Sequence, residues 1–330
     1  MSEHSDLKIV VVGGGTGLST MLRGIKKYTE NITAIVTVAD DGGGSGVLRD
    51  DLGMLPPGDI RNCILALAET EPVMEKLLNY RFGTGILSGQ SFGNLFLAAM
   101  HGISENFEEA VKRASDVLKI KGTVLPVTLS DVHINARLCD GTVIKGESNI
   151  SKGLKTGLKK IEKIEMVPEN AKILPDALEA IEKADLIVLG PGSIYTSVIP
   201  NLIVKGVAEA IKKSSAKVVY VCNIMSQPGE SDEMTAFDHV QAIINHSCEG
   251  IIDACIANVE PISEEMMKKY HLKNSATVTV DDENFAKAGI KLVKGNYIFI
   301  KDGKYVRHEC DKLALSILGE YEGEKALAGV

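Results

Sequence analysis

Two glycine-rich stretches hold the residues whose types and spacing best suit chemistry. Lys8 to Gly17 reads KIVVVGGGTG, an apolar strand pattern that ends in glycines directly before a predicted helix. Bare backbone N–H groups at the positive end of a helix suit a phosphate or pyrophosphate. The spacing departs from G-x-G-x-x-G, whose third glycine would fall on Leu18, so a turn that only packs a helix on a strand is the alternative. The candidate binding residues here are Gly13, Gly14, Gly15, Thr16 and Gly17.

The second stretch is acidic. Asp40 and Asp41 end an apolar strand pattern and open the sequence DDGGGSG, which also contains Ser45 as a candidate ligand contact. In a doubly wound sheet, an acid about twenty residues beyond the glycine turn lies beside the ribose or the phosphates of a nucleotide. Adjacent carboxylates repel each other unless a cation, a hydroxyl or a proton relieves them. A Mg²⁺ ion that bridges Asp40 or Asp41 to a diphosphate would do so, and a solvated turn is the alternative.

Further polar residues stand at predicted helix starts and strand ends. Each of them taken singly is also common as a helix cap or a surface residue, and Asp59 is a candidate cap of this kind. We regard eight as candidate site residues: Arg61, Asn62, Ser91, Asn94, Gly192, Ser193, Asn201 and Asn223.

Apolar strand patterns alternate with helical patterns along most of the chain. This alternation predicts an α/β fold, a Rossmann-like, doubly wound and mainly parallel sheet in a single domain over residues 1–330. If the strand at 8–12 neighbours the strand at 186–189, their glycine loops meet at one crevice. Residues 122–174 do not follow this alternation of strand and helix patterns. We expect them to form a β-rich insertion, with a hairpin at Asp140-Gly141, an irregular Lys-rich part over 151–174, and a role as wall or lid.

The composition restricts the function classes. The net charge is −8 and basic residues form no long run, which argues against nucleic-acid and membrane-surface partners. The six cysteines show no C-x-x-C spacing and are expected to be reduced core residues. No signal peptide pattern and no apolar run of about 18 residues is present, so we expect a cytoplasmic protein.

Six motifs together resemble a known family: GGGTGL, DDGGGSG, PPGDIRN, GQSFGNLF, LGPGSIYTSVIPNL and YVCNIMSQPGE. They look like the bacterial gluconeogenesis factor family, within the superfamily of the CofD-like 2-phospho-L-lactate transferase, and the resemblance runs from Lys8 to about Gly319. It implies a Rossmann-like fold, binding of UDP-sugars such as UDP-N-acetylglucosamine, and a role in gluconeogenic growth, cell-wall precursor supply and cell shape. It also implies glucosamine-6-phosphate synthase as a protein partner.

The resemblance also suggests roles for single residues. Asp40 and Asp41 match the acidic loop, which implies a divalent metal or transfer chemistry, and Asn201 matches a Pro-Asn-Leu element. Tyr270 and Arg307 match residues that hold the sugar nucleotide. An aromatic ring can stack on uracil and a guanidinium can pair with a diphosphate, so these residue types suit the role.

The sequence departs from the family pattern at three positions. Gly44 and Val47 stand where a Ser and an Arg are usual, which removes one phosphate contact, and Gln90 stands where a His is common. The absence of a titratable group at that position argues against proton transfer there.

Three hypotheses follow. The first is a UDP-sugar-binding regulatory protein that acts through a partner enzyme. The second is a metal-dependent nucleotidyl or phosphoryl transferase, with Asp40 and Asp41 holding Mg²⁺. The third is NAD binding at the same crevice, which fits the first strand but lacks a recognisable acid–base partner for hydride transfer. Paired apolar helical patterns are compatible with a homodimer.

Overall fold

The computed structural model describes residues 4–69, 71–153, 160–272 and 274–328. Its centre is a seven-stranded sheet, in which every pairing is parallel. The strands in spatial order are β10 (Lys291–Gly295), β9 (Ala254–Asn258), β8 (Lys217–Val221), β7 (Leu186–Leu189), β1 (Ile9–Gly13), β2 (Ile32–Val36) and β3 (Thr123–Pro126).

The inner strands are buried because they consist of branched apolar residues that fit a sheet covered on both faces. All residues of β1, β7 and β9 are buried. In β1 and β7, Ile9 lies opposite Leu186 and Val12 opposite Leu189, so the two strands end side by side. The predicted doubly wound α/β class and the predicted neighbourhood of these strands are therefore confirmed.

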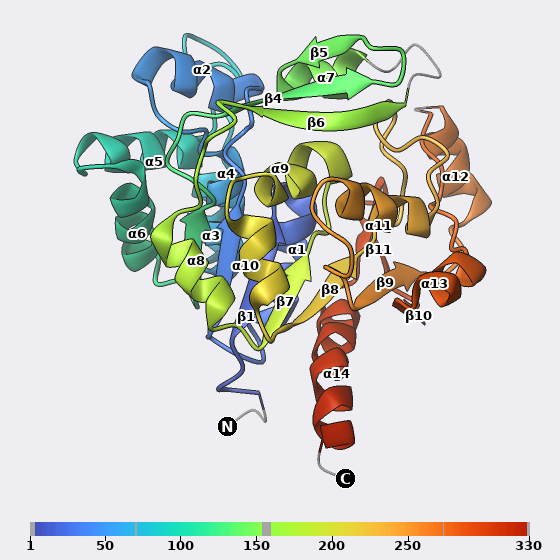
Figure 1. Cartoon of the computed structure of the whole chain (residues 1–330). Coiled ribbons are helices and arrows are strands. Elements are labelled where there is room, and N and C mark those ends of the chain that lie inside the picture. Colours follow the sequence, from blue (N-terminus) through green and yellow to red (C-terminus); the bar gives the residue numbers. More distant parts are fainter. Residues whose placement is uncertain (1–3, 70, 154–159, 273, 329–330) are drawn as a thin grey trace.

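Helices cover both faces of the sheet (Figure 1). Contacts place α1, α3, α6 and α14 together on one face and α8, α9, α10 and α11 on the other. Their bounds are α1 Gly15–Ile25, α3 Gly58–Leu67, α6 Phe107–Leu118, α14 Cys310–Ala328, α8 Pro175–Glu182, α9 Ile199–Leu202, α10 Val207–Lys213 and α11 Ala236–Asn245. The remaining helices are α2 Gly43–Leu52, α4 Pro72–Asn79, α5 Phe92–Gly102, α7 Glu147–Gly153, α12 Glu264–His271, α13 Asp282–Ala288 and the π-helix η2 Ile194–Val198.

A small antiparallel sheet lies across the edge formed by the carboxyl ends of the strands, at the top of Figure 1. It consists of β4 (His133–Leu138), β5 (Val143–Lys145) and β6 (Ile161–Val167), with β4 in the middle. The backbone turns back between Leu138 and Thr142, which confirms the predicted hairpin. We call residues 133–167 the insertion.

Two sequence-based boundaries of this region need correction. Residues 123–126 are not part of the insertion, because β3 pairs with β2 at the edge of the central sheet. Within the segment 151–174, which was expected to be irregular, residues 161–167 form β6. Ile161, Ile164 and Met166 are its buried residues, so their side chains pack against the body of the protein.

The acidic loop is also shorter than predicted. Instead of running from Asp40 to Gly46, it ends at Gly42, where the extended N-cap of α2 is found. The first turn of α2 closes through a 3.0 Å bond from the Gly46 N–H to the Gly42 carbonyl. A Cβ at Gly46 would lie 2.3 Å from the Asp41 carbonyl oxygen, so glycine permits this close turn.

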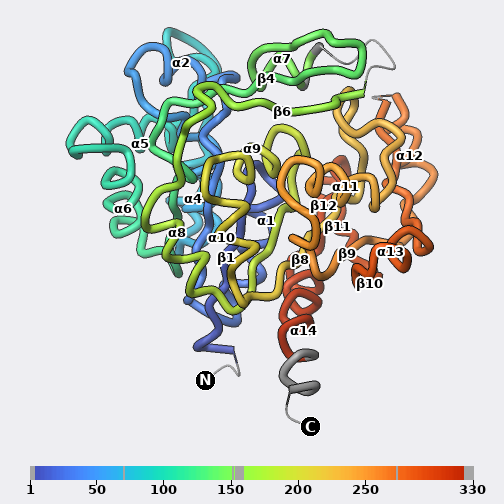
Figure 2. The backbone as a smooth tube through the Cα atoms, viewed as in Figure 1, coloured from blue at the N-terminus to red at the C-terminus, as the bar shows by residue number. Residues whose placement is uncertain are grey.

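The C-terminal part adds a hairpin of β11 (Ile298–Lys301) and β12 (Tyr305–His308). Val306 of this hairpin packs with Ile224 and Met266 in a small second cluster beside the end of β8. Helix α14 then leaves the body at the end opposite the insertion, close to where the described chain begins (Figure 2). No helix in the described ranges has both the length and the apolar character needed to cross a membrane.

Candidate functional site

The glycine loops that follow β1 and β7 pack directly on each other. A Cβ at Gly17 would lie 2.6 Å from the Pro191 carbonyl oxygen, and a Cβ at Gly192 would lie 3.1 Å from the Gly14 carbonyl oxygen. The Asn201 amide nitrogen donates to the carbonyl oxygens of Gly13 at 3.0 Å and Ser197 at 2.8 Å. The parallel ends of two neighbouring strands thus hold both loops at the crossover point of the sheet, where ligands bind in open α/β folds.

This packing separates the predicted residues by role. Asn201 has 0% exposure and Gly14 is enclosed by Asp59, Thr37 and Ser197, so both hold the loops in place. Gly15, with φ +73°, and the exposed Thr16 stand at the accessible start of α1. The packing interpretation of the glycine turn therefore explains Gly14 and Gly17, whereas the exposed Thr16 is where an anion could reach the start of α1.

Asp59 occupies a position that its motif did not reveal. The N-cap of α3 is Pro57, and Asp59 lies in the first turn of the helix, where its carboxyl accepts a hydrogen bond from the backbone of Gly15. Burial, and next the negative charge of Asp40, raise the pKa of Asp59 to about 6. A carboxyl group with this pKa beside a glycine turn is a candidate acid or base, or a ligand of a cation.

The adjacent acids Asp40 and Asp41 have different surroundings. Asp40 Oδ1 accepts a 2.9 Å bond from the Gly42 N–H, and Asp41 Oδ1 accepts a 2.8 Å bond from the Ser148 N–H of the insertion. Glu147, the first residue of α7, directly precedes Ser148, and its Oε2 would lie 4.0 Å from a Cβ at Gly42. Burial, followed by the charge of Asp40, raises the pKa of Glu147 to about 7. The insertion thus carries a carboxyl group to the acidic loop.

The loop after β8 is hydrogen-bonded to the glycine loop after β7. The Asn223 amide donates a 2.7 Å bond to the Gly192 carbonyl. Glu230, only 6% exposed, accepts a hydrogen bond from the Ser193 hydroxyl and a 2.5 Å bond from the Gln227 amide. Ser193 Oγ in turn accepts from Thr196 Oγ1 at 2.7 Å, so the Ser193 side chain is committed to this network.

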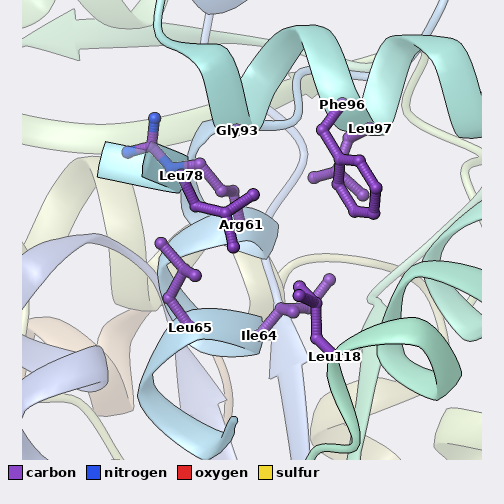
Figure 3. A pocket seen from close by; sticks show the side chains of 8 residues that line it. All are labelled: Arg61, Ile64, Leu65, Leu78, Gly93, Phe96, Leu97 and Leu118. Carbon is purple, nitrogen blue, oxygen red and sulfur yellow. The ribbon is translucent and has the colours of Figure 1, made fainter. Parts of the chain in front are cut away.

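The structure brings four predicted residues of α3 and α5 together. The Arg61 guanidinium donates to Ser91 Oγ, to Asn94 Oδ1 at 2.9 Å and to Asn62 Oδ1 at 2.7 Å, while its Nε is buried without a partner. The Arg61 stem also lines a cavity of about 10 Å³, with its guanidinium turned away from the apolar lining (Figure 3). Since this volume holds about one water molecule, the cavity is a packing gap.

Ser45 lies in the first turn of α2, and Gln90 packs against the same turn. Ser45 is buried, and its Oγ would lie 2.6 Å from a Cβ at Gly58. Gln90 is 7% exposed, its Oε1 has no hydrogen-bond partner, and a Cβ at Gly44 would lie 2.8 Å from that oxygen. Gly44 therefore leaves the room that the Gln90 side chain occupies, so two of the three departures from the family pattern lie against each other.

Tyr270 and Arg307 lie together beside the end of β8. The Tyr270 hydroxyl accepts a 2.7 Å bond from the Val306 N–H, and the Arg307 guanidinium donates 3.0 Å to the Val306 carbonyl. The guanidinium carbon lies 5.4 Å from the centre of the Tyr305 ring. In the described ranges, the contacts link these two residues to the glycine loops only indirectly. Tyr270 packs against the cluster that contains Ile224, and Ile224 follows Asn223, whose amide donates to the Gly192 carbonyl.

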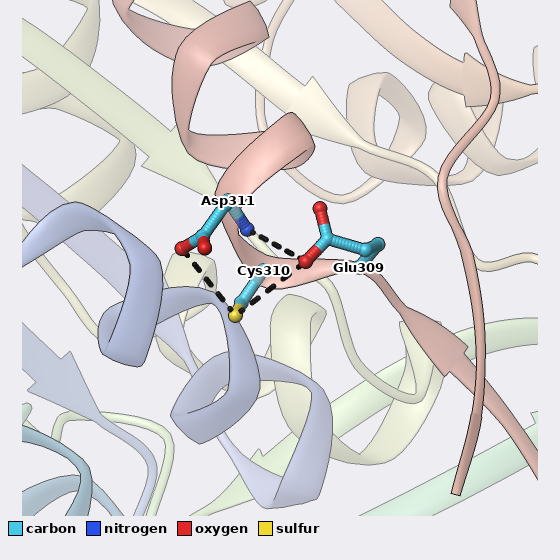
Figure 4. Close-up of side chains that lie close together, drawn as sticks. All are labelled: Glu309, Cys310 and Asp311. Atoms are coloured by element: carbon cyan, nitrogen blue, oxygen red, sulfur yellow. Dashed lines mark hydrogen bonds between the residues drawn. The ribbon is translucent and has the colours of Figure 1, made fainter.

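One further group of potential metal ligands stands at the start of α14, where ligand atoms of Glu309, Cys310 and Asp311 lie within 4.8 Å of one another (Figure 4). The Glu309 carboxylate accepts bonds from the N–H groups of Asp311 and Lys312, and Asp311 pairs with Lys27. Helix capping and an ion pair explain this group. Within the described ranges, the crevice carboxylates form no comparable group of three.

The fold and site define a Rossmann-like α/β protein with its candidate site at the crossover of the sheet. A family model for the 2-phospho-L-lactate transferase CofD matches residues 9–298. A putative gluconeogenesis factor of Thermoanaerobacterium thermosulfurigenes is 58% identical over 315 residues, covering 96% of this chain and 97% of that protein. The gluconeogenesis factor of Bacillus subtilis is 44% identical over 308 residues, covering 93% and 96%. The chain belongs to the CofD family, with relatives named gluconeogenesis factors.

A solved structure agrees with this assignment. The crystal structure of a Bacillus halodurans protein superposes with a TM-score of 0.91 at 46% identity, covering 94% of this chain and 99% of that chain. The fold and the family are therefore those that the six sequence motifs implied.

Sequence reasoning missed three carboxylates of the crevice: Asp59, Glu147 and Glu230. Asp59 and Glu230 lie inside motifs that were noted, PPGDIRN and MSQPGE, but their direction depends on the packing of α3 and of the β8 loop. Glu147 lies more than a hundred positions after Asp41 and reaches it only because the insertion folds back. No local pattern signals such an approach.

Proposed function

We propose that this protein binds a UDP-sugar, with UDP-N-acetylglucosamine as the first candidate, and regulates cell-wall precursor supply during gluconeogenic growth. The observation that supports this most directly is the meeting of the β1 and β7 glycine loops at the crossover of a parallel sheet. This is where nucleotides and their diphosphates bind in open α/β folds. The family membership and the names of the relatives point in the same direction.

The proposed ligand would lie along the loops that follow β1, β7 and β8. Its diphosphate would approach the start of α1 at the exposed Thr16, and its base or sugar would extend toward the β8 loop. Tyr270 and Arg307 stand on that flank, with residue types that suit a uracil ring and a phosphate. Regulation through a partner enzyme, glucosamine-6-phosphate synthase in the first instance, is the second part of this proposal.

A divalent cation fits the donor set of the crevice. Asp40, Asp59 and Glu147 offer only hard oxygen ligands, and the negative charge of Asp40 raises the pKa of both Asp59 and Glu147. Mg²⁺ needs one or two carboxylates and completes its shell with water and phosphate oxygens. Asp40 is the residue that would hold it, and the ion would neutralise the diphosphate charge beside these acids.

A metal-dependent transferase is the second candidate, and a specific observation favours it. The pKa values of Asp59, raised to about 6, and Glu147, raised to about 7, lie in the range of groups that exchange protons near neutral pH. A regulator needs no such group. The two candidates differ in whether the bound nucleotide is converted.

Calorimetric titration with UDP-N-acetylglucosamine, UDP-glucose, NAD and GDP, each with and without Mg²⁺, tests the proposal. Each mixture is then incubated and separated by chromatography. We expect micromolar affinity for the UDP-sugar, an unchanged ligand, and loss of binding in Arg307→Ala. If the bound nucleotide is converted and Asp40→Asn abolishes this conversion, the transferase is established instead. Failure to bind any UDP-sugar would refute the proposed ligand. Synthase activity with and without the protein tests the partner.

A further inference from the structure

The Asp41 carboxylate contacts the insertion. Its Oδ1 accepts a 2.8 Å bond from the Ser148 N–H, and its Oδ2 would lie 2.6 Å from a Cβ at Gly146. Gly146 has φ +88°, a conformation that favours glycine. Both carboxylate oxygens of Asp41 therefore face the turn that leads into α7, and the contact fixes the position of the next residue, Glu147.

Asp40 and Glu147 approach one common point from two different elements. A Cβ at Gly42 would lie 3.4 Å from Asp40 Oδ1 and 4.0 Å from Glu147 Oε2. On its other side, Asp40 Oδ2 would lie 3.4 Å from a Cβ at Gly58, which also approaches Ser45 Oγ. Within the described ranges, neither Asp40 nor Glu147 forms an ion pair with a basic side chain. Two carboxylates without a basic partner thus border the same bare stretch of backbone.

A neutral oxygen lies against the start of the same helix, two residues after Gly42. Gln90 is more than nine-tenths buried, and its Oε1 has no hydrogen-bond donor and lies against Gly44 in the first turn of α2. A buried acceptor without a donor is costly, and a cation within its reach would remove this cost as well as the repulsion of the carboxylates. Carboxylate, amide carbonyl and hydroxyl oxygens are the ligands that Mg²⁺ and Mn²⁺ prefer.

We propose that Asp40 and Glu147, rather than Asp40 and Asp41, are the carboxylate pair that binds a divalent cation, and that Asp41 is a positioning residue that docks the segment carrying Glu147. The insertion then supplies a ligand and completes the site when it lies over the crevice. This deepens the proposed function and rests on it for the diphosphate that would share the cation.

The test is binding of Mn²⁺ alone to the full chain, followed by electron paramagnetic resonance of the free ion. We expect Glu147→Gln and Asp40→Asn each to weaken Mn²⁺ binding by about tenfold or more, or about 1.4 kcal/mol. Asp41→Asn should stay within about twofold of wild type, because the Asn carbonyl still accepts from the Ser148 N–H. Glu162→Gln, an exposed residue of β6, is the matched control on the insertion and should bind Mn²⁺ like wild type.

Two outcomes would overturn the assignment: no Mn²⁺ binding by the wild-type chain, or loss of binding in Asp41→Asn together with wild-type binding in Glu147→Gln. Thermal unfolding of each variant shows that it is folded. A parallel titration with UDP-N-acetylglucosamine separates the two proposals. Binding of the UDP-sugar without Mn²⁺ binding refutes only the cation site, and the expected Mn²⁺ pattern without UDP-sugar affinity refutes only the proposed ligand.

Discussion

Gly17 marks the closest approach of the two loops that build the site. Its missing side chain faces backbone rather than a flexible side chain, because a Cβ would lie 2.6 Å from the Pro191 carbonyl oxygen and 3.0 Å from its carbon. Backbone atoms in a tied loop cannot move aside cheaply. We therefore expect Gly17→Ala to separate the loops, to lower the free energy of unfolding by about 1–3 kcal/mol, and to weaken nucleotide binding.

Urea unfolding and UDP-sugar titration measure both effects. Gly83→Ala is the control, because a Cβ at Gly83 meets nothing within 4 Å and lies in a surface segment. If Gly17→Ala unfolds like Gly83→Ala and binds ligand normally, the loops are not in the contact that we describe.

At the scale of elements, the insertion is fastened to the body at three places. Near its start, the buried Arg49 of α2 donates to Val132 at 2.7 Å and pairs with Asp131. In its middle, Asp41 caps Ser148. Near its end, His246 after α11 accepts a 2.8 Å bond at Nε2 from the Ile164 N–H of β6. Loops from both sides of the crevice thus hold the element that carries Glu147.

The contact at His246 depends on pH. Its Nδ1 lies 2.7 Å from the Ala242 carbonyl and carries the proton, so Nε2 accepts only in the neutral ring. Burial, and also the charge of Lys163, lower the pKa of His246 below 6.5, while the Tyr195 ring contacts its edge. The neutral ring is therefore favoured by folding, and its contribution to stability is present above about pH 6.5 and is lost as the pH falls.

We expect His246→Phe, which keeps the ring and removes the acceptor, to lower the stability by about 1–3 kcal/mol at pH 7.5 and by less at pH 5.5. Urea unfolding at both pH values provides the comparison, and hydrogen exchange of the Ile164 amide locates the change on β6. An equal loss at both pH values would show that protonation of His246 does not affect this contact.

The sequence predicts some of these elements well and others not at all. The apolar runs of β1, β7 and β8 are recognisable because strands buried on both faces must be apolar throughout. The start of α2 was missed since glycines have low helix propensity, and tertiary contacts at Gly44 and Gly46 override that preference. The crevice acids were found only where two of them adjoin in sequence, because the others meet through packing.

At the scale of the whole molecule, two sets of titratable groups act on stability with opposite sign. Burial lowers the pKa of His308 to about 4 and also lowers the pKa of His239 and His246, so the molecule loses stability as the pH falls below about 6.5. The raised pKa values of Asp59 and Glu147 act in reverse. Their contribution is full below their ordinary pKa values and is lost as the pH rises through about 6 and 7.

These opposing effects predict a narrow maximum of stability between about pH 6 and 7 when cations are removed with EDTA.

Glu147→Gln removes the cost of an ionised carboxylate beside Asp40 and should therefore add about 1–3 kcal/mol at pH 8, with little gain at pH 4, where Glu147 is protonated in both states. Urea unfolding from pH 4 to pH 9 measures the profile, and Glu162→Gln is the control. If Mg²⁺ raises the wild-type stability at pH 8 and leaves Glu147→Gln unchanged, the repulsion and the proposed cation act on the same carboxylate. A variant no more stable than wild type at pH 8 would instead show that the insertion does not hold Glu147 against the acidic loop in solution.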